Sequence, residues 1–244
     1  MGLLAIVVFF SLKNIKAGYG RFYNETWGPT INNRLGWFLM EAPVFFFMMT
    51  LWLMSDRVSS WPHIVIFLFF QLHYFQRSFI FPLLLRGKGI MPISIIGMGV
   101  LFNMFNALMQ GGWLFFVSPD YYYTSEWFTT PQFIIGSIVF FIGMWVNLSS
   151  DHIIRQLRKH NDNKHYMPQK GMFKYVTSAN YTGECLEWIG YAILTWSLAA
   201  LVFTLWVIST LLPRAASLYE YYKLEYPATF EKHKNLKRII PFIY

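Results

Sequence analysis

The chain has 244 residues, of which 55% are hydrophobic and 20% aromatic, while only 13% are charged. That charged share is about half of what soluble globular domains carry, which leaves too little polar surface for a water-soluble fold of this size. The formal net charge is +8, yet the basic residues fall between apolar blocks rather than in one tract. The single cysteine, Cys185, excludes an intramolecular disulfide. The composition favours a polytopic membrane protein over a soluble enzyme, a disordered chain or a nucleic-acid-binding domain.

Apolar blocks of roughly membrane-spanning length follow one another along the chain. A helix needs about 20 predominantly apolar residues to cross the core of a bilayer. The first apolar segment, 3–12, is too short to cross comfortably unless its helix extends toward Phe22. The longer blocks, each of which we expect to be helical, cover 35–54, 61–85, 91–117, 131–149 and 189–212.

The connections between these blocks differ in their content of Lys and Arg. Eleven such residues lie in the alternate connections 13–34, 86–90 and 150–172, whereas the other two connections carry only Arg57. Basic connections stay on the cytoplasmic side of a membrane, so we expect the N-terminus outside. The tail 213–244 carries six basic residues and is therefore expected in the cytoplasm.

This orientation constrains the segment 173–212. The chain enters it from the cytoplasmic side and the tail leaves on the same side, so the segment must cross the membrane twice or not at all. Forty residues are enough for two helices, which gives seven spans in total. Residues 173–190 are too polar to face lipid, so a membrane helix there must line a cavity. An interfacial amphipathic helix is an equal alternative.

Polar side chains inside the predicted helices repeat at spacings that place them on shared faces. Ionisable groups in a bilayer are costly and usually functional, so several such faces indicate one hydrated cavity toward the cytoplasmic end. The alternative is that amides and hydroxyls join neighbouring helices, an alternative that is stronger for Asn103 than for Glu41. The sets are Gln71, Tyr74, Arg77 and Ser78; Asn103, Asn106 and Gln110; Asn147, Asp151, Arg155 and Arg158; and Asn180, Glu184, Glu187 and Tyr191.

Glu41 lies alone among aromatic residues and methionines, directly before Ala42 and Pro43. A carboxyl group in these surroundings needs a partner or a proton, because a low dielectric disfavours its charged form. A neutral carboxylic acid beside a tyrosine hydroxyl can polarise a carbonyl oxygen of a substrate. Glu41 and Tyr74 are therefore a candidate electrophilic pair.

The sequence lacks the standard motifs for a bound nucleotide or metal. The G-x-G at Gly97 and Gly99 lies inside an apolar run without the strand, turn and helix of a dinucleotide site. No zinc-binding spacing of Cys and His is present, and we expect no metal site. A dinucleotide would have to be held by side chains, for which the polar face from Asn147 to Arg158 supplies suitable donors.

Several long segments together resemble the steroid 5α-reductases (3-oxo-5α-steroid 4-dehydrogenases). The resemblance covers most of the chain and is densest from about 145 onward. The matching segments are NLSSDHIIRQLRK (147–159), the run from MPQKGMFKYV to WSLAA (167–200), the ending from YP to IIPFIY (226–244), WFLMEAP (37–43) and LHYFQRSFIFPLLLRGK (72–88).

The resemblance implies a single membrane-embedded domain over 1–244 with seven helices, whose cofactor-binding half covers about 145–244. It implies an enzyme that uses NADPH to reduce the 4,5 double bond of a 3-oxo-4-ene steroid, with hydride transferred to carbon 5. The catalytic residues of the family, which bind the 3-oxo group, match Glu41 and Tyr74. The matching cofactor-binding residues are Arg77, Lys88, Asn147, Asp151, Arg158, Asn180, Glu184 and Tyr222. Aromatic residues that match the steroid and nicotinamide region are Trp37, Phe102 and Trp188.

The chain departs from the family pattern at a few positions. Met40 replaces the Gln that precedes the catalytic Glu in mammalian members, and His165 stands where the family has Tyr. Tyr219 ends a stretch that is rich in His in the family, so a cofactor-contacting His has no counterpart. The basic residue near the terminal motif is Lys237 or Arg238, in an ambiguous register.

Other functions remain as alternatives at this point. Related architectures include reductases of other unsaturated lipids (enoyl-CoA, polyprenols or sterols) and methyltransferases of the isoprenylcysteine type. A transporter or lipid-binding protein would explain a polar cavity but not the joint spacing of the motifs. We expect a monomer that contacts a steroid and membrane lipids but no nucleic acid, in a bacterial inner membrane or the endoplasmic reticulum.

Overall fold

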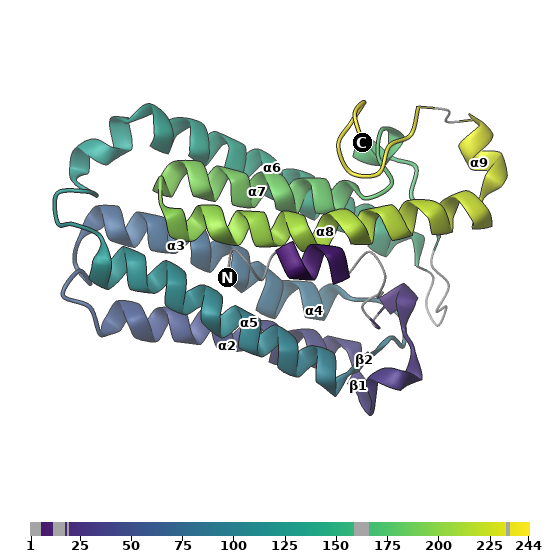
Figure 1. The fold of residues 1–244 in the computed structure, drawn as a ribbon, viewed down its shortest axis with the longest axis horizontal. Helices are drawn as coiled ribbons and strands as arrows, with labels where there is room; N and C mark the ends of the chain where they lie inside the picture. The colour runs from purple at the N-terminus through teal and green to yellow at the C-terminus, as the bar shows by residue number, and fades with distance from the viewer. Residues whose placement is uncertain (1–5, 12–17, 19, 159–165, 233–234) are drawn as a thin grey trace. The chain divides into compact units, whose positions relative to one another are not determined.

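A computed structural model of the chain describes residues 6–11, 18, 20–158, 166–232 and 235–244, whose path is drawn in Figure 1. Most of these residues are helical, in agreement with the predicted all-α class. They divide into two compact units, each of which is described by itself. The N-terminal unit comprises Ala17–Ser137 and Tyr191–Ala200, and the C-terminal unit comprises Met1–Lys16, Ile138–Gly190 and Leu201–Tyr244. That the whole chain is one domain stays a prediction.

Long helices make up most of the N-terminal unit. Pro82 has no N–H to bond the Ser78 carbonyl, and a wider π turn lies immediately before it. Short 3-10 turns cover Gly20–Phe22 (η1), Glu25–Trp27 (η2) and Ser125–Thr129 (η5). The long segments are α2 (Asn33–Leu53); α3 (Trp61–Phe75), which continues through the π-helix η3 (Gln76–Ile80) into α4 (Phe81–Leu84); and α5 (Ile93–Gly112), which continues into the π-helix η4 (Trp113–Val117).

A small antiparallel sheet aligns the starts of α2 and α5. Strand β1 (Thr30–Asn32) pairs with β2 (Ile90–Pro92), and each strand leads directly into one of the two helices. The Asn32 side chain also accepts a hydrogen bond from the Arg34 backbone N–H at 2.9 Å, which caps α2. Figure 1 shows α2 and α5 running side by side from this sheet. The sequence did not predict this sheet within the all-α fold, because strands of three residues carry almost no pattern in the sequence.

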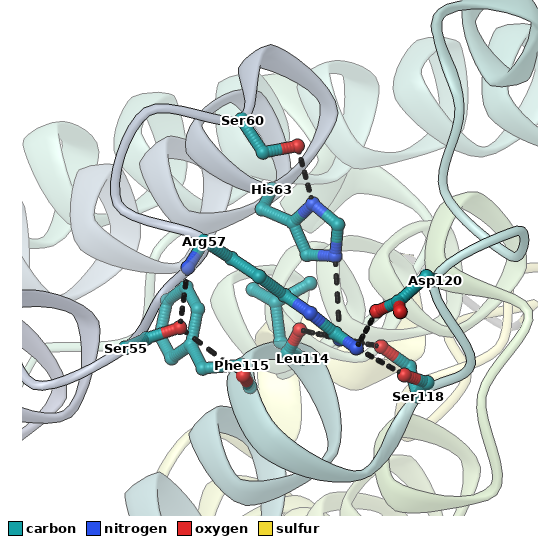
Figure 2. A network of polar contacts seen from close by, with 8 residues as sticks. All are labelled: Ser55, Arg57, Ser60, His63, Leu114, Phe115, Ser118 and Asp120. Carbon is teal, nitrogen blue, oxygen red and sulfur yellow. Dashed lines mark hydrogen bonds and ion pairs between the residues drawn. The ribbon is translucent and has the colours of Figure 1, made fainter.

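Arg57 closes the far end of the N-terminal unit, as Figure 2 shows. Its Nη1 donates to the Leu114 carbonyl at 3.0 Å and to the Ser118 hydroxyl, and its Nη2 donates to the Ser118 carbonyl. Nη2 also pairs with Asp120 Oδ1 at 2.9 Å, and His63 Nε2 lies 3.5 Å from Nη1. The last carbonyls of a helix lack partners and carry partial negative charge, which a guanidinium group satisfies. Arg57, the one Lys or Arg in the connections that the sequence predicts outside the cytoplasm, thus caps the helix α5–η4.

The C-terminal unit is built from three long helices and the chain's end. Backbone hydrogen bonds join the segment before α7 to the tail, with Thr177 N donating to Lys237 O at 2.9 Å and Ser178 N donating to Arg238 O at 3.1 Å. Its helices are α6 (Pro131–Leu157), which starts in the N-terminal unit; η6 (Gly171–Lys174); α7 (Ala179–Thr195), which ends in the N-terminal unit; α8 (Leu198–Glu225); and α9 (Pro227–Lys232).

Five helices among the described residues are long and apolar enough to cross a membrane. Four of them confirm the predicted blocks. Helix α6 continues beyond the predicted end at residue 149 to Leu157, because its last turns are helical although they are polar. The block predicted at 189–212 is wrong as a single helix, since the chain turns at Trp196 (φ 48°) between α7 and α8. Residues 6–11 of the first apolar segment are helical, and the rest of 3–12 lies outside the described residues. The candidate spans are Asn33–Leu53, Trp61–Leu84, Ile93–Val117, Pro131–Leu157 and Leu198–Glu225.

Candidate functional site

Helices α2 and α5 approach each other closely at Gly99. A Cβ atom at this position would lie 2.4 Å from Met40 Sδ, so the missing side chain makes room for Met40. Asn103 follows one turn later on the same face of α5. Its Nδ2 donates a hydrogen bond to the Met40 carbonyl at 3.1 Å. The close approach thus puts an amide of α5 against the backbone of α2 beside Glu41.

Glu41 and Tyr74 meet at the same amide. Asn103 Nδ2 donates to Glu41 Oε2 at 2.9 Å, and the Tyr74 hydroxyl donates to Asn103 Oδ1 at 3.4 Å. All three side chains are buried, with exposed fractions of 8% for Glu41, 3% for Tyr74 and 6% for Asn103. Three helices, α2, α3 and α5, therefore bring the two predicted catalytic residues to one point of the N-terminal unit.

The polar face of α5 extends this group of hydrogen bonds. Asn106 Nδ2 donates to the Tyr74 hydroxyl oxygen at 2.9 Å. Gln110 Nε2 lies 3.4 Å from Asn106 Oδ1 and 3.2 Å from the Ala199 carbonyl, to both of which it donates. Gln71 is a different case, because its Nε2 donates to the Phe45 carbonyl of α2 at 3.2 Å. Gln71 thus joins α3 to α2, which agrees with the alternative that polar side chains join neighbouring helices.

Arg77 lies against aromatic rings rather than in open solvent. Its guanidinium carbon is 4.7 Å from the ring centroid of Trp37 and 4.7 Å from that of Phe81. These two rings meet edge to face at 5.2 Å. Arg77 belongs to the π-helix η3, whose extra residue per turn shifts the direction of its side chains. The structure thus brings together two predicted site residues, Arg77 and Trp37.

Two further predicted residues of the N-terminal unit lie nearby in the chain. Phe102 directly precedes Asn103 and is half-buried on α5. Lys88 is exposed on the connection between α4 and β2. An exposed ammonium group can reach a phosphate without losing its hydration first, whereas Phe102 offers only apolar contact. The two residues therefore suit the different roles that the resemblance gives them.

In the C-terminal unit, α6 and α7 pack backbone to backbone. A Cβ atom at Gly143 would lie 2.3 Å from Glu187 N, and one at Gly183 would lie 2.3 Å from Asn147 N. Small residues allow such close approach between membrane helices. At this contact, the buried Asn147 donates through Nδ2 to the Asn180 carbonyl at 2.9 Å. Two predicted cofactor-binding residues are thereby in direct contact.

The remaining polar candidates of α6 and α7 lie along the same two helices. Asp151 is one turn beyond Asn147 and is buried, with 6% of its surface exposed. Glu184 is one turn beyond Asn180 and is half-buried. Arg158 is half-buried and comes one residue after the end of α6. Asn147, Asp151 and Arg158 thus follow the polar face that the sequence predicted.

Tyr222 and Trp188 take structural positions in this unit. The Tyr222 hydroxyl donates to the Tyr166 carbonyl at 3.5 Å, and its ring belongs to a buried cluster with Met167. Trp188 is 1% exposed and packs edge to face on Phe203, with ring centroids 4.5 Å apart. Both residues are therefore part of the buried packing of the C-terminal unit.

The tail places Arg238 rather than Lys237 over aromatic rings. The Arg238 guanidinium carbon lies 5.2 Å from the ring of Tyr219 and 4.8 Å from that of Tyr244, and Nη2 pairs with Glu220 at 3.2 Å. Tyr219, which ends the stretch that is His-rich in the family, thus stacks on Arg238. His165 lies outside the described residues.

Asn103 and Asn106 are the contributors that the sequence did not assign to the site. The sequence placed them on one face but favoured helix joining for Asn103. A usable signal was present, since both lie at helical spacings from Gly99, where a close helix contact forms.

Comparisons with known proteins show the family to which the chain is similar. Residues 89–244 match the family model of 3-oxo-5-alpha-steroid 4-dehydrogenase. The chain is 35% identical over 243 residues to steroid 5-alpha-reductase DET2 of Arabidopsis thaliana, covering 96% of this chain and 90% of that protein. It is 34% identical over 245 residues to 3-oxo-5-alpha-steroid 4-dehydrogenase 1 of Rattus norvegicus (99% and 92%). It is 38% identical over 233 residues to 3-oxo-5-alpha-steroid 4-dehydrogenase 2 of Sus scrofa (93% and 88%).

Proposed function

The chain belongs to the 3-oxo-5-alpha-steroid 4-dehydrogenase family, and we propose on that basis that it reduces the 4,5 double bond of 3-oxo-4-ene steroids, such as testosterone or progesterone, to 5α-dihydrosteroids. It is an oxidoreductase that acts on CH–CH bonds, and the resemblance read from its sequence is confirmed. NADPH would supply the hydride, which adds to carbon 5 of the conjugated enone.

The contact of Glu41 and Tyr74 with Asn103 is the observation that supports this reaction most directly. Addition at carbon 5 leaves negative charge on the 3-oxo oxygen, and donors aimed at that oxygen stabilise the enolate. A tyrosine hydroxyl and a neutral carboxylic acid are both suitable donors in a buried site. Protonation at carbon 4 then completes a product that is two hydrogen atoms heavier than the substrate.

The cofactor site is proposed from the donors that the buried face of α6 and α7 offers. Asn147 and Asp151 are both buried polar residues, an arrangement that suits a polar ligand better than lipid. Ser178 is fully buried directly before α7, and its hydroxyl has no hydrogen-bond partner among the described residues. NADPH fits this set, and the residues of the C-terminal unit that would hold it are Asn147, Asp151, Arg158, Asn180, Glu184 and Tyr222. The resemblance to the family adds Arg77 and Lys88 to the proposed cofactor-binding residues.

The resemblance to the family gives Trp37, Phe102 and Trp188 as the residues proposed to contact the steroid, and apolar rings suit a fused hydrocarbon skeleton. We propose seven membrane spans with the N-terminus outside and the C-terminus in the cytoplasm, based on the charge asymmetry of the loops and on the two helices α7 and α8. The enzyme would act as a monomer in a bacterial inner membrane or the endoplasmic reticulum.

Turnover by purified protein tests the proposal. With NADPH and testosterone or progesterone, mass spectrometry should detect a product that has gained two hydrogen atoms. Tyr74→Phe removes a polarising donor, and Glu41→Gln replaces an acidic O–H donor by a weaker N–H donor, so each should lower kcat by about 10²- to 10⁴-fold. Absence of the mass gain with every 3-oxo-4-ene steroid would disprove the substrate assignment.

Matched controls separate chemistry from folding. Tyr123 is also buried, and its hydroxyl accepts from Trp113 Nε1 at 2.9 Å and donates to the Thr195 carbonyl at 2.7 Å. Tyr123→Phe should therefore lower stability modestly and leave kcat within about twofold of the wild type. Equal loss of kcat in Tyr123→Phe and Tyr74→Phe would contradict the assignment of Tyr74.

A further inference from the structure

We propose that Asn103 and Asn106 form an amide clamp that fixes Glu41 and Tyr74 in their working orientation. Both asparagines are positioning residues, because they act through the electrophilic pair rather than on the steroid. The proposal rests on the proposed function, in which that pair polarises the 3-oxo group.

Asn103 holds both members of the pair with one planar group. Its Nδ2 carries two hydrogens, and it donates to Glu41 Oε2 at 2.9 Å and to the Met40 carbonyl at 3.1 Å. Its Oδ1 lies 3.4 Å from the Tyr74 hydroxyl. The bond to the backbone of Met40 fixes the plane of the amide, so both ends of the amide are aimed by a single anchor. A Leu in its place would offer neither a donor nor an acceptor.

The direction of these bonds determines which atoms can donate to a substrate. The Glu41 oxygen that accepts from Asn103 is Oε2, so a proton on a neutral Glu41 is favoured on the other oxygen, Oε1. The carboxyl group then presents its O–H away from Asn103. Asn103 thus selects the donor atom of the acid as well as its position.

Asn106 performs the equivalent task for Tyr74. Its Nδ2 donates to the phenol oxygen at 2.9 Å, which fixes that oxygen and stabilises negative charge on it. The hydroxyl's own bond to Asn103 Oδ1 is longer, at 3.4 Å, and therefore weak. The O–H can consequently turn toward a substrate oxygen at little cost, while the oxygen atom stays in place.

The clamp is held from behind by the fold. Asn106 is completely buried, and Gln110 donates to its Oδ1 while also donating to the Ala199 carbonyl. Asn103 is held close to α2 because Gly99, one turn earlier, accommodates Met40. Side chains whose orientations are locked in this way keep a catalytic group within the narrow limits that catalysis requires.

A double-mutant cycle with purified enzyme tests the clamp. Asn103→Leu should lower kcat by about 10- to 100-fold with saturating steroid, as expected when a reacting group is misplaced by a fraction of an ångström to one ångström. The KM for NADPH should stay within about twofold. In the Glu41→Gln background the same substitution should cost less than about threefold, because Asn103 acts through Glu41.

Two further variants keep the test decisive if Asn103→Leu fails to fold. Asn103→Asp conserves volume and the acceptor for Tyr74, but it places a carboxyl group against Glu41, so it should lose at least as much kcat as Asn103→Leu. Gln71→Leu removes a buried amide that bonds an α2 carbonyl elsewhere, and it should keep kcat within about twofold. Melting temperatures in detergent confirm that the compared variants are folded.

The outcomes distinguish the clamp from the proposed function. The proposed function stands if the wild type reduces the steroid and Glu41→Gln does not. In that case the clamp is wrong if the effects of the Asn103 and Glu41 substitutions on kcat multiply, or if Asn103→Asp keeps the wild-type rate. If the wild type reduces no 3-oxo-4-ene steroid, both are wrong. Non-additive losses together with an unchanged Gln71→Leu enzyme support the clamp.

Discussion

The contact between α2 and α5 and the contact between α6 and α7 use the same local pattern. In each, a glycine precedes an asparagine by four residues, Gly99 before Asn103 and Gly143 before Asn147. In each, the asparagine Nδ2 donates to a backbone carbonyl of the facing helix, at 3.1 Å to Met40 and at 2.9 Å to Asn180. One contact lies in the N-terminal unit and the other in the C-terminal unit.

The two contacts differ in what the glycine faces. Gly99 faces the side chain of Met40, which is flexible and can move. Gly143 and Gly183 face backbone atoms of α7 and α6, which cannot move without separating the helices. The first contact leaves the amide of Asn103 a side-chain partner, Glu41, whereas the second locks two main chains together. The same pattern thus orients a polar side-chain group in one place and forms a rigid joint between main chains in the other.

The largest effect should come from Gly183→Ala. Its Cβ would lie 2.3 Å from Asn147 N and 2.7 Å from the Gly143 carbonyl oxygen, so α6 and α7 must separate. We expect a loss of about 3 kcal/mol or more, which corresponds to a fall in Tm of at least about 6 °C for a chain of this length. Thermal unfolding in detergent measures it. Gly112→Ala is the control, since a Cβ there meets nothing within 4 Å, and an unchanged Tm in Gly183→Ala would refute the rigid joint.

A smaller and more specific effect is expected from Asn147→Leu. It removes the bond to the Asn180 carbonyl and a donor of the proposed cofactor site. The KM for NADPH should rise by about 10-fold or more, while the KM for the steroid changes by less than about threefold. Initial rates at varied NADPH measure this. Ser149→Ala is the control, because among the described residues the Ser149 hydroxyl bonds within α6, to the Val146 carbonyl at 3.2 Å. Equal rises in both KM values would contradict the cofactor role of Asn147.

The smallest effect should come from Gly99→Ala. The new Cβ meets Met40 Sδ, and the methionine can rotate away, so Tm should fall by no more than about 4 °C. The rate should fall about two- to fivefold, because the anchor of Asn103 at Met40 shifts slightly. Gly97→Ala, two residues earlier with no atom within 4 Å of its Cβ, should match the wild type in both measurements. A fall in Tm as large as that of Gly183→Ala would remove the distinction between the two contacts.

The sequence suggested Glu41 and Tyr74 as a candidate catalytic pair because the chemistry restricts the choice. A lone carboxyl group at Glu41 requires a partner in an apolar surround, and Tyr74 supplies a hydroxyl on a neighbouring predicted helix. The bridge through Asn103 was not predicted, since the spacing of Asn103 and Asn106 gives their shared face but not the helix that this face meets. The packing between helices decides which helix this face meets. The packing of α5 on α2 depends in turn on the absence of a side chain at Gly99.

The helices themselves were predicted more closely than their ends. Hydrophobic length located α2, α3 and α5 within a few residues, because crossing a bilayer and forming a long helix require the same apolar run. The apolar run of α6 ends at residue 149, but the helix continues to Leu157. Its last turns are polar, and helical hydrogen bonding continues regardless of hydropathy. The turn at Trp196 was not located, although the loop charges had already indicated that 173–212 crosses the membrane twice or not at all.

The Arg57 cap also has a consequence for the order in which the chain is assembled. Its partners Leu114 and Ser118 lie 57 and 61 residues further along the chain, so they do not yet exist when α2 and α3 are synthesised. Until residue 118 has emerged, the guanidinium group remains charged and hydrated, which favours keeping the loop 55–60 in water. Once α5–η4 is complete, the same charge is withdrawn into the helix end. Arg57 thus serves first to hold a loop at the surface and afterwards to close the N-terminal unit.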